Sequence, residues 1–149
     1  MIKTKLISLL ILLSACASAR ADQIDFSDGW SEQSFSLFSS NEFEPNGETL
    51  HIRSDGTVSM FWSRLPPALW DSTQAVWDWE VISSVPPTDL TVKGGDDRNL
   101  SVYFVFMPEA SLPKPQAKLT DLLGNTRARV LMYIWGGDHR RGEILPTPY

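Results

Sequence analysis

Two adjacent carboxylates, Asp96 and Asp97, follow a glycine pair in segment 93–98 (KGGDDR). Their mutual repulsion must be relieved by a cation, a basic neighbour or solvent. One interpretation is a Ca²⁺ site, since Ca²⁺ prefers hard oxygen ligands on flexible loops. A second is an acid and base pair that hydrolyses a glycoside with Asp138 as a partner. A third, which the sequence favours, is a solvated turn whose charge the flanking basic residues neutralise.

A second polar loop, segment 136–141 (GGDHRR), directly follows an apolar run. Asp138 and His139 are candidates for proton transfer, and Arg140 is a candidate for receiving a carboxylate or phosphate. A solvated loop without a ligand is the competing interpretation. His51 is the only other histidine, so a histidine-rich metal centre is excluded.

The chain holds six tryptophans, whose flat faces can stack on sugar rings. Trp62, Trp77 and Trp79 occupy alternating positions of predicted strands, which favours burial in a core. Trp135 ends an apolar run beside glycines, and Trp70 lies in a loop that follows two prolines. We therefore expect Trp70 and Trp135, with Asp138 and Arg140, to be the residues open to a ligand.

The sequence contains no recognised catalytic signature. It has no nucleophile elbow, no phosphate-cradling glycine loop and no dinucleotide fingerprint. No catalytic residue is therefore assigned, and the sequence favours a non-enzymatic role. Ca²⁺ at Asp96 and Asp97 is the one cofactor that it suggests.

Apolar runs at strand spacing predict most of the secondary structure. The predicted strands cover residues 34–38, 49–53, 57–65, 74–82, 100–107 and 127–135. Segment 50–65 is predicted to form a β-hairpin, because Asp55 and Gly56 mark a turn near its middle. The two runs at 100–107 and 127–135 are apolar on both faces, which is typical of central strands.

Helix is expected to be scarce. The ten prolines argue against long helices. One short helix is predicted near 116–123, where Gly124 would end it. Short strands and frequent turns predict an all-β fold, an antiparallel β-sandwich of jelly-roll type, built as a single domain over 22–149.

The first 21 residues resemble a secretory signal peptide, with a basic head, an apolar centre and small residues at the exit. Cys16 follows Leu-Ser-Ala, which resembles the lipobox of bacterial lipoproteins. If Cys16 is acylated, the signal covers 1–15 and a lipid anchors the chain; Ala17, rather than an aspartate, then favours the outer membrane. Ordinary cleavage after Ala21 is the alternative, and it would leave a periplasmic protein without an anchor.

The net charge of the 149-residue chain is −5, and the leader contributes only basic residues. A negative protein is a poor ligand for nucleic acid and for anionic lipid, since both attract lysine and arginine. Contact with a membrane is therefore expected only through the lipid at Cys16.

Several strings together resemble one family. Segments 77–81 (WDWEV), 88–90 (TDL), 93–98, 101–106 (SVYFVF) and 131–136 (LMYIWG) are followed by PTPY at the end of the chain. Over about 26–149 this resembles the uncharacterised bacterial family known as domain of unknown function 3047. The resemblance implies an exported β-sandwich and no particular activity. Members of the family usually continue past Tyr149, which predicts a C-terminally truncated sandwich with an open sheet edge.

The favoured hypothesis is a non-catalytic module of the cell envelope that binds a glycan or another envelope component. One alternative is a carbohydrate-active hydrolase that uses Asp96 and Asp97. Another is a structural or assembly protein whose open edge is completed by another chain.

Overall fold

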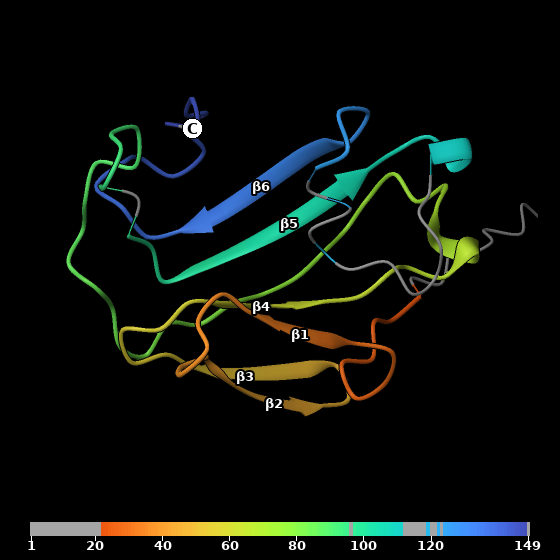
Figure 1. Ribbon diagram of the computed structural model, residues 1–149, viewed down its shortest axis with the longest axis horizontal. Helices are drawn as coiled ribbons and strands as arrows, with labels where there is room; N and C mark the ends of the chain where they lie inside the picture. Colours follow the sequence, from red (N-terminus) through yellow and green to blue (C-terminus); the bar gives the residue numbers. More distant parts are fainter. Residues whose placement is uncertain (1–21, 96, 112–118, 120–121, 123, 149) are drawn as a thin grey trace, which may run out of the picture. The chain divides into compact units, whose positions relative to one another are not determined.

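The computed structural model describes residues 22–95, 97–111, 119, 122 and 124–148. It divides into two compact units, Met1–Trp70 and Asp71–Tyr149 (Figure 1). The first unit contains β1 (Ser31–Ser34), β2 (Glu42–Asn46), β3 (Thr49–Arg53), β4 (Ser59–Trp62) and the 3₁₀ turn η1 (Pro67–Leu69). The second contains β5 (Leu100–Phe106), the 3₁₀ turn η2 (Glu109–Ser111) and β6 (Arg129–Trp135).

The described strands form three two-stranded antiparallel sheets, β1–β4, β2–β3 and β5–β6. The all-β prediction is therefore confirmed, while the sandwich or jelly-roll arrangement stays a prediction. The helix predicted near 116–123 lies outside the described residues except for Leu119 and Leu122. In the described part of the chain, no helix has the length and apolar character needed to cross a bilayer.

The predicted hairpin over 50–65 is wrong, because β3 pairs with β2 and β4 pairs with β1. Asn46 lies opposite Thr49, so the β2–β3 turn consists of Gly47 and Glu48. Gly47 has φ +57°, and a two-residue turn with glycine first matches the twist of the flanking strands. The turn at Gly56 instead connects β3 to β4 without a ladder between them.

The strand predicted over 34–38 is also wrong, because β1 ends at Ser34. The Ser34 hydroxyl donates to the Ser36 carbonyl at 2.7 Å, and the Phe38 N–H donates to Ser36 Oγ at 3.2 Å. Serine side chains that bond the nearby backbone in this way compete with a strand ladder. The apolar side chains of this segment consequently lie exposed.

Stacked aromatic rings join the two sheets of the first unit. Phe61 of β4 stacks on Trp30, with ring centroids 5.3 Å apart, and on Phe43 of β2, with centroids 5.0 Å apart. Phe26 also contacts Trp30, with ring centroids 4.9 Å apart. Trp62, the neighbour of Phe61 on β4, is also half-buried.

β5 and β6 form the longest ladder, running from the Leu100–Trp135 pair to the Phe106–Arg129 pair. Both strands were predicted at these positions, and both are confirmed within two residues at either end. The prediction that they are central is wrong for the described residues, where each has one ladder partner.

Segment 74–82 has the predicted alternation of exposure but is not a strand. Trp77, Trp79 and Val81 are half-buried, while the carboxylates between them are exposed. No sheet includes this segment. Side-chain packing holds it instead, because Trp77 contacts Phe104 and Tyr133 with centroids 5.7 and 4.9 Å away.

Candidate functional site

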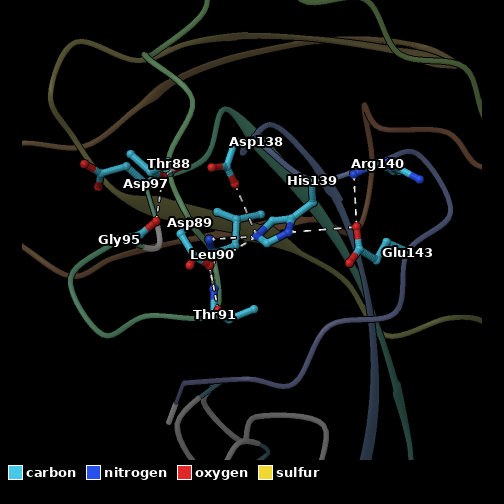
Figure 2. A network of polar contacts seen from close by, with 10 residues as sticks. All are labelled: Thr88, Asp89, Leu90, Thr91, Gly95, Asp97, Asp138, His139, Arg140 and Glu143. Carbon is cyan, nitrogen blue, oxygen red and sulfur yellow. Dashed lines mark hydrogen bonds and ion pairs between the residues drawn. The ribbon is translucent and has the colours of Figure 1, made fainter.

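Segment 88–91 and the polar loop at 136–141 lie together beside the Leu100–Trp135 end of the β5–β6 sheet (Figure 2). The Asp138 N–H donates to the Thr88 carbonyl at 3.0 Å. The Leu90 N–H donates to His139 Nε2 at 3.1 Å. We call segments 88–91 and 137–143, joined in this way, the clasp.

Glycines at the end of β6 allow this close approach. Gly136 and Gly137 have φ of +130° and +79°, in the region that favours glycine. A Cβ on Gly137 would lie 2.6 Å from Leu90 Cδ1, so any side chain there would displace Leu90. Leu90 is only 5% exposed and is one of the two buried apolar side chains among the described residues.

His139 lies in an acidic environment, and its side chain is 18% exposed. Its Nε2 is 3.4 Å from Asp89 Oδ1 and 3.6 Å from Asp138 Oδ1. Its Nδ1 is 4.0 Å from Glu143 Oε2. A ring nitrogen that accepts a hydrogen bond carries no proton, so the bond from Leu90 requires a neutral ring with its proton on Nδ1.

Asp89 is held as a charged hydrogen-bond acceptor. Its Oδ1 accepts from the Thr91 hydroxyl at 2.6 Å and from the Thr91 N–H at 2.9 Å. These bonds, the hydroxyl first, lower the pKa of Asp89 below its ordinary value of 3.8, against a smaller opposing effect of desolvation. A carboxylate with a lowered pKa is a poor general acid near neutral pH.

Glu143 closes the turn at the end of the clasp. Its Oε2 accepts from the Arg140 N–H at 3.1 Å, and its own N–H donates to the Arg140 carbonyl at 3.1 Å. The backbone of Arg140 is thereby fixed, while its side chain is exposed. An anionic partner at Arg140 stays a prediction.

Asp97 approaches the clasp through its backbone. The Thr88 hydroxyl donates to the carbonyls of Gly95 and Asp97. The Asp97 carboxylate is exposed, and Figure 2 shows it pointing away from His139 and Asp138. Asp97 and Asp138 are thus brought into one loop cluster with their carboxylates directed differently.

The other predicted site residues are dispersed. Trp135 is half-buried at the end of β6, two residues before the clasp. Trp70 belongs to the first unit, where its indole N–H donates to the Leu65 carbonyl at 2.9 Å and its ring is exposed. Asp96 and Cys16 lie outside the described residues.

The described residues contain no group of three or more histidine, cysteine or carboxylate side chains arranged to hold a metal ion. In the clasp, the Nε2 lone pair of His139 is already used by the Leu90 N–H. Asp89 Oδ1 likewise accepts two hydrogen bonds. The clasp is therefore built from mutual hydrogen bonds rather than from free ligands.

Sequence reasoning did not identify Thr88, Asp89 and Leu90 as site residues. The one local signal was Asp89 two residues before Thr91, a spacing at which an aspartate can bond the backbone and hydroxyl ahead of it. That spacing predicts a turn, and it carries no information about contact with His139.

The comparison with family models places the chain in a family. The model described as protein of unknown function (DUF3047) matches residues 28–149, and the chain belongs to that family. No curated protein and no solved structure matches the chain. The resemblance inferred from the motif strings is therefore confirmed at the level of the family.

We predict that Gly137→Ala will destabilise the protein by about 2–3 kcal/mol, because it combines an unfavourable positive φ with a clash against Leu90. Gly142→Ala is the matched control. Gly142 also has a positive φ, +84°, but nothing lies within 4 Å of its Cβ position. Urea unfolding measures both, and equal losses in the two variants would refute the role of the Leu90 contact.

We predict that Asp89→Asn will lower stability at neutral pH and that this difference will close as the pH falls. A carboxyl whose folded pKa lies below its unfolded value stabilises the fold above that unfolded value, about 3.9, and loses the effect as pH drops through the folded pKa. Thermal unfolding from neutral pH to strongly acidic pH measures the difference. Asp78→Asn, outside the clasp, is the control; a pH-independent difference for Asp89→Asn would contradict the prediction.

Proposed function

We propose that this chain is an exported, non-catalytic module of the bacterial cell envelope that binds a glycan. The observation that carries the proposal is a group of aromatic rings held against one face of the β5–β6 sheet. Opposite residues of an antiparallel ladder share a face. Val102 lies opposite Tyr133 and Phe104 opposite Leu131, so these side chains lie on one face.

Trp77 packs on the same face and fixes the Tyr133 ring. The two rings meet at 71° with centroids 4.9 Å apart, and Phe104 meets Tyr133 at 89° with centroids 6.0 Å apart. Tyr133 nevertheless remains 42% exposed, and its neighbour Leu131 is 48% exposed. A ring that is rigid before binding loses little conformational entropy when a flat, weakly polar ligand stacks on it. The C–H face of a sugar ring has that character.

The clasp supports binding over catalysis. A general base must reach the proton that it removes, yet His139 Nε2 is engaged with the Leu90 N–H. A glycosidase needs two carboxyl groups flanking one bond, whereas the Asp97 and Asp138 carboxylates point in different directions. The hydrolase alternative therefore has less support than the binding module.

We predict that Tyr133→Ala will weaken binding of an envelope polysaccharide by at least about tenfold, because it removes the exposed ring of the platform. Val130→Ala is the matched control, since Val130 is 51% exposed on the opposite face of the same strand. Tryptophan fluorescence titration with purified envelope polysaccharides measures both.

A folded protein that responds to none of these polysaccharides would overturn the glycan proposal. Binding that both variants retain would place the ligand elsewhere and remove the Tyr133 platform from the account. Capture of an envelope protein in place of a polysaccharide would also count against it.

We propose further that Cys16 is acylated and anchors the chain to the outer membrane. The lipobox-like string before Cys16 supports this. Two or three acyl chains bind a bilayer durably, because each buried CH₂ contributes about 0.8 kcal/mol. We predict that the intact mass of the protein from envelope fractions will correspond to a chain that begins at acylated Cys16. A mass for a chain that begins at Asp22 would contradict the anchor, and Cys16→Ser should release the protein from the membrane fraction.

A further inference from the structure

We infer that the clasp is a proton-operated latch in which His139 is the sensor. In the closed state, Nε2 of the neutral ring accepts a hydrogen bond from the Leu90 N–H. Uptake of a proton from solvent at Nε2 breaks that hydrogen bond. The protonated ring then forms hydrogen bonds with the neighbouring carboxylates instead. Segment 88–91 is then released from segment 137–139.

The two states exclude each other because Nε2 has a single lone pair. It can accept from the Leu90 N–H, 3.1 Å away, or it can bind a proton. If Nε2 were protonated in the observed geometry, two N–H groups would point at each other. The closed clasp therefore requires the neutral ring with its proton on Nδ1.

Carboxylate groups lie near both ring nitrogens of His139. Asp89 on segment 88–91 and Asp138 on segment 137–143 face Nε2 at 3.4 and 3.6 Å. Glu143 faces Nδ1 at 4.0 Å, and it also accepts the Arg140 N–H at 3.1 Å. The cationic Arg140 side chain is exposed.

A small movement of the ring would convert either Nε2 contact into a charge-assisted hydrogen bond. The imidazolium thus has new partners at once, whereas the Leu90 N–H loses its acceptor.

The hydrogen bond of the Leu90 N–H lies next to other contacts that hold segment 88–91 in place. Leu90 is buried against Gly137, and the adjacent backbone bond joins Asp138 to Thr88. Thr88 in turn holds the carbonyls of Gly95 and Asp97. Opening at Leu90 would therefore loosen the segment that carries Asp97. This inference does not depend on the identity of any ligand.

The test uses the complete chain and nuclear magnetic resonance between about pH 8 and pH 5, the range in which histidines change charge. Long-range ¹H–¹⁵N spectra report the tautomer and protonation of each histidine. Amide exchange, expressed as protection factors, reports opening at Leu90 and Asp138. We expect the Nδ1–H tautomer for His139 at the upper pH, and protection of both amides that falls at least about tenfold as His139 becomes protonated.

His51 provides the matched control, since it is exposed on β3 in the other unit. His51→Gln should leave the loss of protection unchanged. His139→Gln should make the protection of the two amides independent of pH, because the glutamine side-chain oxygen can accept from the Leu90 N–H and does not titrate.

Three results would each overturn the latch. They are an Nε2–H tautomer for His139 at the upper pH, protection at Leu90 that persists once His139 is protonated, and a loss of protection that remains in His139→Gln. The first two are measured on the unaltered chain, so the inference stays testable even if His139→Gln does not fold.

Discussion

The hydrogen bond from the Leu90 N–H to His139 Nε2 joins residues 49 positions apart, and the loop geometry of the second unit depends on it. The intervening chain contains both β5 and β6. Closing so long a loop has an entropic cost that local turns do not face. Formation of the β5–β6 ladder already closes most of this loop, because the ladder brings Leu100 opposite Trp135. The clasp then needs only the glycine pair and the small contact surface of Leu90.

Among the described residues of both units, aromatic packing takes the place of a large buried core. Only Leu90 and Leu119 are buried apolar side chains among the described residues. In the first unit Trp30, Phe61 and Phe43 stack in sequence. In the second, Trp77 meets Tyr133 edge to face and packs against Phe104 at a tilt of 50°. Half-exposed rings stabilise the fold and still offer a surface to a ligand, so one set of residues can serve both purposes.

Sequence reasoning succeeded where a signal is local and failed where it is not. β3, β5 and β6 were predictable, because alternating or continuous apolar runs specify strands directly. The partner of β3 was not, since the turn at Gly47 and the turn at Gly56 both resemble hairpin turns and only tertiary packing selects between them. Segment 74–82 shows that alternation reports burial, while a ladder also needs a neighbouring strand. Asp138, His139 and Arg140 were recognisable as a polar loop, whereas Asp89 and Leu90 became site residues only through the fold.

The account depends most on the Leu90–His139 hydrogen bond, and the most direct test is a ¹⁵N–¹⁵N scalar coupling across it in the uniformly ¹⁵N-labelled chain. Such a coupling passes from donor to acceptor nitrogen only when the bond exists. The account predicts a resolved coupling between the Leu90 amide nitrogen and His139 Nε2 while the ring is neutral. A neutral His139 ring with no coupling to Leu90 would contradict it.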